Sequence, residues 1–187
     1  MPPKIKITKQ QIIDISFEII RKEGIEALNA RKIAKELNCS VQPIFSNFNN
    51  MNDLKEELHQ KISTYYYNYL IKGELSYKAI GTNYVKFARE EKELFKVIIQ
   101  KQGNLDEFFL TDQIYLQYVE KMLMERELTK EQALVFHKKM WLFIHGLASL
   151  IAYQDFNITD QEISQYLTEQ YQALINWEKE YGKGNRS

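Results

Sequence analysis

Cysteine, glycine and proline are scarce in this chain of 187 residues, which contains one Cys, seven Gly and three Pro. The single cysteine, Cys39, excludes an internal disulfide and a zinc site built from several cysteines, and it fits a reducing compartment. With so few turn-forming residues, the chain has few positions for hairpin turns or for the loops of a β-sandwich. The fold class we predict is therefore all-α, with about nine helices read from the apolar periodicity.

Long apolar runs are also missing. The most apolar stretch, residues 141–152 (WLFIHGLASLIA), is too short to span a bilayer. The N-terminal stretch MPPKIKITKQQ has no apolar segment of the kind that a secretory signal needs. We therefore expect a cytoplasmic protein that does not associate with membranes.

The chain lacks the motifs of the common enzyme classes. Its three histidines, His59, His137 and His145, are scattered along the sequence. It contains no nucleophile elbow, no phosphate-binding glycine loop and no zinc motif. A helical enzyme is the competing class, but it would need convergent polar groups. We predict no enzyme, no catalytic residue, no cofactor and no metal.

The net charge of zero hides an uneven distribution. Residues 1–50 hold eight basic and five acidic residues, so this part carries a formal charge of +3 and the remainder −3. The pattern suits a basic head on an acidic body, although random scatter would also produce it.

Two helices are predicted in the first part of the chain. Apolar residues at spacings of three and four predict a helix that begins after Thr8 and ends at Glu23. Gly24 follows it, where a left-handed C-cap residue belongs. Asn29 is a good N-cap for a second, short helix.

The next segment predicts a turn and a third helix. Residues 37–40 (LNCS) form the turn, with Asn38 at the position that usually requires a glycine with positive φ. Ser40 is predicted to cap a helix that begins at Val41 and has Pro43 in its first turn. Its apolar residues, predicted to face a core, are Ile44, Phe45 and Phe48.

Two short helices joined by such a turn, after a longer first helix, are typical of a helix-turn-helix. The exposed residues expected on the second helix are Val41, Gln42, Ser46 and Asn47. Gln can pair with adenine, and small or apolar groups can contact a thymine methyl. The alternative is that this polar stretch is simply a loop.

Several residues match a known pattern together: Thr8, Gly24, Leu28-Asn29-x-Arg31-x-Ile33-Ala34, Pro43-Ile44-Phe45, Phe48 and Asp53-Leu54. With them, residues 8–58 resemble the DNA-binding domain of the TetR family of transcriptional regulators. The resemblance implies a homodimer that places residues 41–47 in successive major grooves of a near-palindromic DNA operator. The DNA contacts that we infer from it come from Lys9, Asn29, Arg31, Ser40, Val41, Gln42, Pro43, Phe45, Ser46, Asn47 and Lys55.

The chain departs from the family pattern at four places. The turn has Asn38-Cys39 where the family usually has Gly-Val, and Asn47 stands where it usually has His. Phe45 replaces a tyrosine and Met51 replaces a lysine, both of which commonly hold phosphates in the family. Lys55, one helical turn beyond Met51, is the candidate replacement for that lysine. Cys39 is interpreted as a small buried side chain in the turn rather than a redox switch.

The rest of the chain predicts helices throughout, so we expect two domains, at 1–50 and 51–187. A helix over 52–72 is expected to be the only rigid link between them. Thr129 with Gln132 and Thr159 with Glu162 predict capping boxes for two long final helices, at 130–153 and 160–181. The stretch around Ala79–Phe95 and the string Trp141-x-x-x-His145-Gly146 resemble one branch of the TetR family.

That resemblance implies an effector-binding and dimerisation domain. The pocket residues expected for an unidentified small molecule are Phe95, Phe108, Tyr115, Trp141 and His145. The dimer residues expected on the last two helices are Leu147, Ile151, Ile163, Leu167, Tyr171 and Leu174, with Tyr166, Ala173 and Trp177 forming a second stripe. Alternatives stay open: an ordinary aromatic core, a His145 satisfied by a tyrosine hydroxyl or a carbonyl, and a monomer.

The function predicted from the sequence is a repressor that a small molecule releases from DNA. Activation instead of repression also agrees with the sequence. So does a helical regulator that acts through protein partners and reads DNA weakly, because two phosphate-binding residues of the family are replaced.

Overall fold

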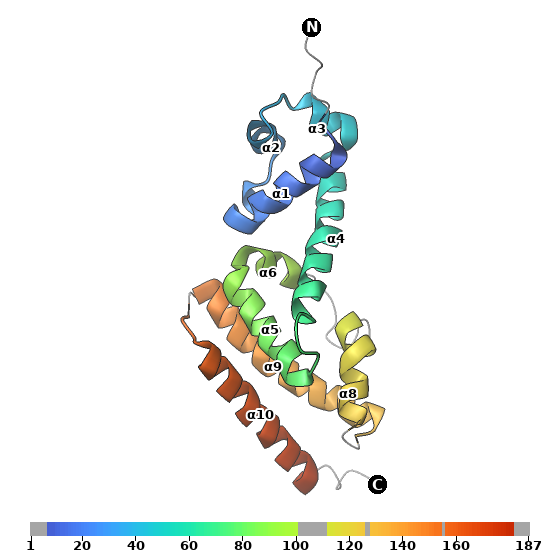
Figure 1. The fold of residues 1–187 in the computed structure, drawn as a ribbon, viewed down its shortest axis with the longest axis vertical. Helices are drawn as coiled ribbons and strands as arrows, with labels where there is room; N and C mark the ends of the chain where they lie inside the picture. Colours follow the sequence, from blue (N-terminus) through green and yellow to red (C-terminus); the bar gives the residue numbers. More distant parts are fainter. Residues whose placement is uncertain (1–6, 101–111, 126–127, 155, 182–187) are drawn as a thin grey trace. The chain divides into compact units, whose positions relative to one another are not determined.

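The computed structural model describes residues 7–100, 112–125, 128–154 and 156–181, and within these ranges the chain is all-α, as predicted (Figure 1). A 3₁₀ turn, η1 (Ile25–Ala27), and a π turn, η2 (Tyr115–Val119), accompany nine α-helices in the described residues. The α-helices are α1 (Lys9–Glu23), α2 (Ala30–Glu36), α3 (Gln42–Asn47), α4 (Met51–Leu70), α5 (Tyr77–Glu90), α6 (Lys92–Ile99), α8 (Glu120–Met124), α9 (Lys130–Gln154) and α10 (Asp160–Tyr181).

The chain forms two compact units, which we call the head and the body. The head comprises Met1–Tyr66 and Glu91–Lys101, and the body comprises Tyr67–Glu90 and Gln102–Ser187. The boundary therefore differs from the one expected after residue 50: most of α4 and all of α6 belong to the head. Helix α4 is also not the only link, because the chain passes between the units again at Glu90–Glu91.

Helix α1 begins and ends where the sequence predicted. Thr8 and Gln11 form a capping box at its start, with the Gln11 N–H donating to Thr8 Oγ1 at 3.2 Å. Gly24 ends it with φ +84° and ψ 168°, so the predicted positive φ is confirmed but the left-handed helical conformation is not. A Cβ at Gly24 would lie 2.7 Å from Glu93 Oε2, the end of a flexible side chain that can move away, so the backbone conformation is what favours glycine here.

A buried carboxylate holds α6 within the head. Glu91 is only 5% exposed and accepts both Arg21 Nε at 2.7 Å and Arg21 Nη2 at 2.5 Å. The Tyr65 hydroxyl donates to the same carboxylate at 2.8 Å. Bidentate, charge-assisted bonds of this kind are the stronger class of hydrogen bond. The start of α6 is thus tied to α1 and α4, which are far away in sequence.

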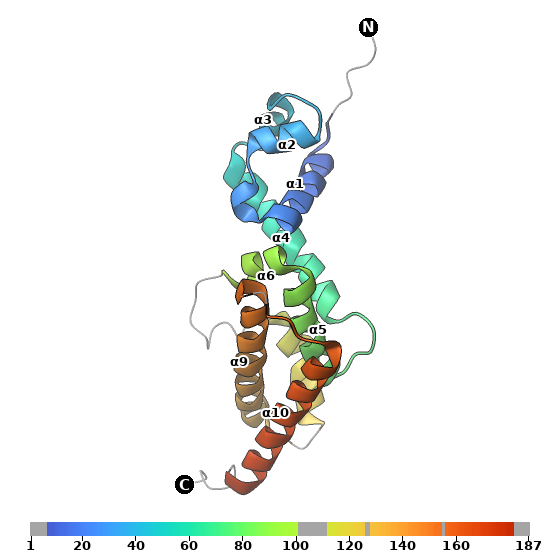
Figure 2. The ribbon, with the colours of Figure 1, turned by 90° about the vertical axis from the view of Figure 1, so that its left-hand side faces the viewer.

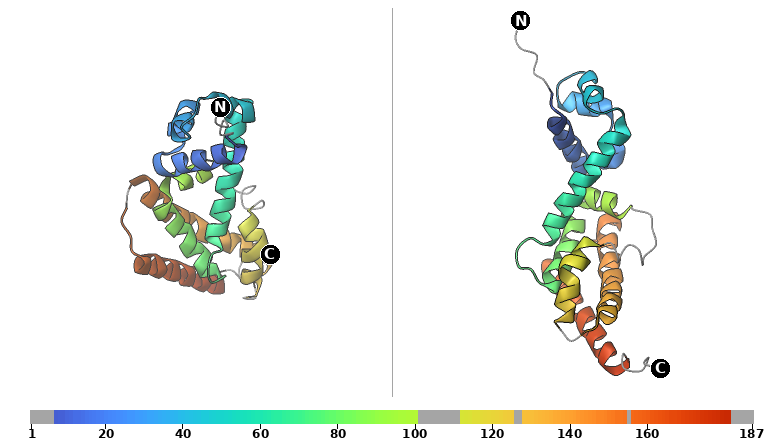
Figure 3. Two further views of the ribbon diagram at one scale, coloured as in Figure 1. Left: turned by 45° about the horizontal axis from the view of Figure 1, so that its top comes forward. Right: turned by 90° about the vertical axis from the view of Figure 1, so that its right-hand side faces the viewer.

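The body is built around α5, α9 and α10. Helix α5 packs against α9, and α10 runs back beside both, as Figures 1 and 2 show from two sides and Figure 3 shows in further views. Both predicted capping boxes are confirmed: the Gln132 N–H donates to Thr129 Oγ1 at 3.3 Å and the Glu162 N–H to Thr159 Oγ1 at 3.2 Å.

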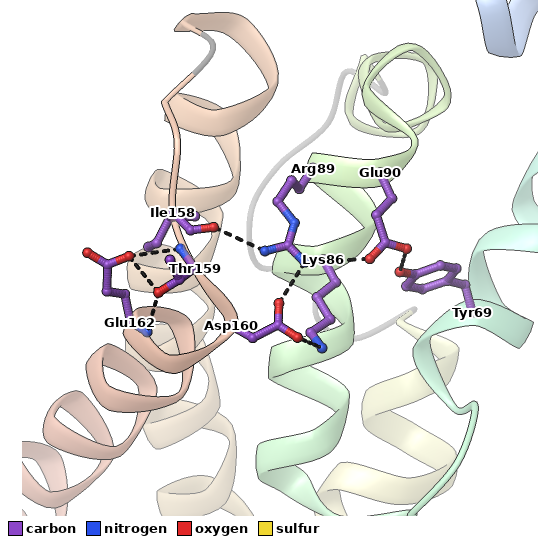
Figure 4. Close-up of polar contacts among 8 residues, drawn as sticks. All are labelled: Tyr69, Lys86, Arg89, Glu90, Ile158, Thr159, Asp160 and Glu162. Atoms are coloured by element: carbon purple, nitrogen blue, oxygen red, sulfur yellow. Dashed lines mark hydrogen bonds and ion pairs between the residues drawn. The ribbon is translucent and has the colours of Figure 1, made fainter.

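Polar contacts fix the start of α10 on α5 (Figure 4). Arg89 donates to Asp160 Oδ1 at 2.7 Å and to the Ile158 carbonyl at 3.0 Å, and Lys86 pairs with the same carboxylate. The hydrogen bonds from Lys86 and Arg89 hold the pKa of Asp160 below its usual range. Because the Asp160 side chain is largely exposed, these contacts set the position of the loop more than they add to stability.

Replacing Arg21 tests the tie between α1 and α6. Arg21→Ala leaves the buried Glu91 carboxylate with a single described hydroxyl donor, so we expect the free energy of unfolding to fall by about 1–3 kcal/mol. Urea unfolding at pH 7 measures the change. Lys22→Ala, at the next and also exposed position of α1, is the matched control and should stay within about 0.5 kcal/mol of the parent. Equal losses in both variants would show that the contact is not stabilising.

Candidate nucleic-acid interface and effector region

Helices α2 and α3 and the turn between them form a helix-turn-helix in the head. Asn29 caps α2, its Oδ1 accepting the Lys32 N–H at 3.0 Å. Asn38 has φ +50°, as predicted, and the Cys39 N–H donates to the Ala34 carbonyl at 2.9 Å. Cys39 is half-buried in this turn.

Helix α3 begins one residue later than expected, at Gln42. The predicted cap by Ser40 is wrong, because Val41 occupies the N-cap position and no side chain caps the helix there. The Val41 carbonyl instead accepts the Ile44 N–H at 3.1 Å. Pro43 lies in the first turn, where a missing N–H costs no helix hydrogen bond.

One face of α3 is anchored and the other is exposed. Ile44 and Phe48, four residues apart, are buried in the head, as predicted. Phe45 is 50% exposed, so the prediction that it faces the core is wrong. The reason is geometric: in a helix of six residues Phe45 is rotated about 100° from Ile44. Val41 is exposed as well, to 40%.

The polar side chains of α3 differ in their availability. Ser46 Oγ donates to the Gln42 carbonyl at 2.9 Å, and the half-buried Asn47 donates its Nδ2 to the Pro43 carbonyl at 2.7 Å. Gln42 is exposed and has no hydrogen bond from its side chain to another described residue. Of the predicted polar readers, Gln42 is the one whose whole amide is available.

The candidate phosphate-binding residues also fall into two groups. Lys9 pairs with Glu57 and lies 5.2 Å from the centre of the Phe48 ring, and the Asn29 side chain is occupied by its capping contacts. Arg31 and Lys55 are exposed and form no ion pair with another described residue. Lys35 shares these properties, although the sequence analysis did not single it out. It lies four residues after Arg31, so the helical spacing was the available signal.

The predicted effector residues do not form one described group. Phe95 is fully buried on α6 in the head, whereas Tyr115, Trp141 and His145 belong to the body. Phe108 lies outside the described residues. Trp141 stacks on His145 with ring centres 4.4 Å apart, and the Tyr84 hydroxyl lies 2.7 Å from His145 Nδ1. A hydroxyl partner is one of the two that the sequence analysis expected for a structural His145.

His137 is a buried residue of this region that was not among the predicted site residues. It is 7% exposed, stacks on Tyr115 with ring centres 5.0 Å apart, and has the Tyr77 hydroxyl 3.2 Å from Nδ1. Burial lowers the pKa of His137 to about 4, so the ring is neutral at physiological pH. Its position two helical turns before His145 was the only sequence signal.

Part of the predicted dimer stripe is covered by the protomer itself. Ile151, Ile163 and Leu167 are buried, and a side chain without exposed surface has none to offer a partner, so this prediction is corrected. Leu147, Tyr171 and Leu174 are half-buried. The exposed large apolar side chains of α9 and α10 are Val135, Leu142, Leu150, Tyr153, Tyr166 and Trp177. They include two residues of the second stripe.

The described residues offer neither a candidate metal site nor a membrane-spanning helix. No group of three or more His, Cys, Asp or Glu side chains in that part of the chain could hold a metal ion. Over the same residues, no helix combines the length and the apolar character that crossing a membrane requires.

Comparisons with known proteins agree with the helix-turn-helix geometry. The chain is 23% identical over 163 residues to YobS, an uncharacterized HTH-type transcriptional regulator of Bacillus subtilis (strain 168), covering 83% of this chain and 85% of the relative. It superposes on a solved TetR family protein from Vibrio parahaemolyticus with a TM-score of 0.57 and 17% identity, over 88% of this chain and 96% of the other. No protein-family model matches the sequence. The chain therefore has a TetR-like fold.

The buried His137 predicts a pH-dependent stability. In the unfolded chain His137 binds a proton near pH 6.5, and in the folded chain it does so only near pH 4. The free energy of unfolding therefore decreases as the pH falls through this window. At pH 5 the loss from this residue should reach about 2 kcal/mol. Urea unfolding of the parent and of His137→Gln at pH 7 and pH 5 measures it, because the variant should lose less stability on acidification. His59→Gln, at an exposed position, is the control. A parallel pH dependence in all three proteins would contradict the assignment.

Proposed function

We propose that this protein is a transcriptional regulator that binds operator DNA as a homodimer through α3 and is released by a small-molecule effector bound in the body. The observation that carries this proposal is the exposed face of α3. Val41, Gln42 and Phe45 project from a helix-turn-helix whose buried side is fixed by Ile44 and Phe48. A rigid, solvent-facing second helix is what entry into a major groove requires.

The charges on the head support DNA as the partner. Arg31, Lys35 and Lys55 are exposed cations of the head that no described residue neutralises. Contacts from such side chains to phosphates position a protein on the duplex, while side chains at base edges give specificity. Lys55 takes the role of the family lysine that Met51 replaces.

Gly146 and the exposed stripe of α9 support the homodimer. A Cβ built on Gly146 meets no atom within 4 Å, so packing within the protomer does not require glycine there. Glycine inside a helix costs roughly 1 kcal/mol relative to alanine. The close approach of a helix from a second copy would explain why this cost is accepted. Leu142 and Leu150 flank Gly146 at four residues on either side and are exposed.

Helix α10 extends the same surface. The ammonium of the half-buried Lys139 on α9 lies 3.4 Å from the centre of the exposed Trp177 ring on α10, so these side chains of the two helices lie next to each other. Two such helices from each copy would form an isologous four-helix interface.

The effector would act through the crossings of the chain between body and head at Tyr66–Tyr67 and Glu90–Glu91. Glu90 accepts the Tyr69 hydroxyl within the body, and the next residue, Glu91, accepts the Tyr65 hydroxyl within the head. These two tyrosines are one turn apart on α4. An effector can change DNA affinity only if it binds one conformation of the dimer more tightly than another. Release from DNA on effector binding is the proposed response.

A second candidate function is a regulator that acts through protein partners. Phe45 and Met51, which lack the phosphate-binding groups of the family pattern, are the observation that favours it. An exposed phenylalanine on a short helix can also anchor a protein partner.

Selection of duplexes from a random pool with the full-length protein tests the proposed function. We expect an enriched, near-palindromic site, with half-sites about one helical turn apart and an affinity that falls as the salt concentration rises. Sequencing after successive rounds identifies the enriched site. Fluorescence anisotropy with that duplex measures the affinity and its salt dependence. A pool that remains random would reject DNA reading and favour the partner-protein function.

The Lys55→Ala variant tests the proposed phosphate contact of Lys55 on the selected duplex. Loss of one phosphate contact per subunit should weaken binding and lower the salt slope by about 1 per contact. Lys78→Ala, at an exposed position of α5 in the body, is the control and should leave the slope unchanged. An unchanged slope for Lys55→Ala would remove this residue from the interface.

Changes to the exposed stripe test the homodimer. Leu142→Asp places a charge at a 53% exposed position, so the protomer should fold while the dimer dissociation constant rises about tenfold or more. Gly146→Ala should raise helix stability and also weaken the dimer, because the added methyl occupies space that only a partner would fill. Sedimentation equilibrium measures both, with Lys78→Asp as the control. Unchanged association in both variants would place the dimer surface elsewhere.

A further inference from the structure

The reading surface of the head carries no charge. Residues 37–52, which include the turn, α3 and the start of α4, contain no Asp, Glu, Lys or Arg. The commonest specific contact to a G·C pair is a bidentate bond from Arg or Lys to guanine O6 and N7. Helix α3 has no side chain that can make this contact.

The groups that α3 exposes can instead contact an A·T base pair. Val41 and Phe45, 40% and 50% exposed, lie four residues apart and therefore on the same side of the helix. Val41 itself has helical dihedral angles, φ −71° and ψ −15°, so this spacing applies from the N-cap onward. Gln42, between them in sequence, presents a free amide that can pair with adenine N6 and N7.

Two hydrogen bonds within α3 reduce the number of its polar groups that are available to contact bases. Ser46 and Asn47 use donor groups on the carbonyls of Gln42 and Pro43 within the same helix. The groups of α3 that stay available are thus the Gln42 amide and the exposed apolar side chains of Val41 and Phe45, and in the major groove the apolar group is the C5-methyl of thymine.

We propose that α3 reads A·T base pairs, with Val41 and Phe45 contacting thymine methyl groups and Gln42 pairing with adenine. This inference rests on the proposed function and adds to it the chemical class of the operator. The half-sites are A·T pairs at the positions that face α3, and the methyl groups contribute directly to affinity.

Thymine-to-deoxyuridine replacement tests the inference, since it removes only the methyl group. Each thymine of the selected operator is replaced in turn, and the dissociation constant is measured by fluorescence anisotropy with the full-length protein. At least one thymine per half-site should show a loss of about fourfold, and its replacement in both half-sites a loss of about 15-fold. Thymines outside the half-sites serve as controls.

Variants of Val41 and Phe45 identify which side chain contacts the thymine methyl group. In Phe45→Ala or Val41→Ala the sensitive thymine should lose its sensitivity, so that deoxyuridine and thymine duplexes bind equally. Phe45→Leu keeps an apolar side chain and should keep most of the effect. Both residues are substantially exposed, and thermal unfolding confirms that the variants are folded.

The outcomes distinguish failure of the proposed function from failure of the A·T inference. If no duplex is enriched, the proposed function fails and this inference fails with it. An enriched operator with G·C pairs throughout its half-sites, or with no thymine sensitive to deoxyuridine, overturns the inference alone. A methyl effect that persists in both alanine variants also overturns it, because other residues would then read the methyl groups.

Discussion

Burial of Ile44 and Phe48 in the head is the constraint on which the candidate interface depends. A helix of six residues has almost no stability of its own in water, because nucleation is costly and few hydrogen bonds follow it. Helix α3 therefore exists because its two apolar anchors are buried and because the positive φ of Asn38 turns the chain after α2. Fixing these two side chains leaves Val41, Gln42 and Phe45 facing solvent.

A second buried group extends the head beyond the helix-turn-helix. The Glu91 carboxylate is nearly inaccessible to water, so it needs partners, and it finds them in Arg21 and Tyr65. Removing any of these partners would leave a buried charge with fewer bonds. This arrangement places α6 with the head, and it makes the Glu90–Glu91 step a crossing between the units. The proposed response to an effector can thus pass through the Glu90–Glu91 step as well as through α4.

The candidate interface separates reading from phosphate binding more sharply than the sequence suggests. In the proposed complex, the uncharged stretch over residues 37–52 supplies the side chains that contact bases, and the cations proposed to contact phosphates, Arg31, Lys35 and Lys55, come from α2 and from α4 after its first turn. Lys9, expected on the interface, is partly engaged by Glu57 and by the Phe48 ring. The proposed interface therefore relies on shape and apolar contact at the bases, with charge confined to the flanking residues.

Local sequence patterns determined the all-α class, the bounds of α1, the capping boxes of α9 and α10 and the positive φ of Asn38. Each of these depends on residues within about one or two helical turns, where spacing and capping chemistry act directly. Tertiary structure decided what depends on distant residues: the place of α6 in the head, the burial of Ile151, Ile163 and Leu167, and the exposure of Phe45. An apolar residue in a sequence can face its own core or a partner equally well. Only the packing of the other helices determines which face is already covered.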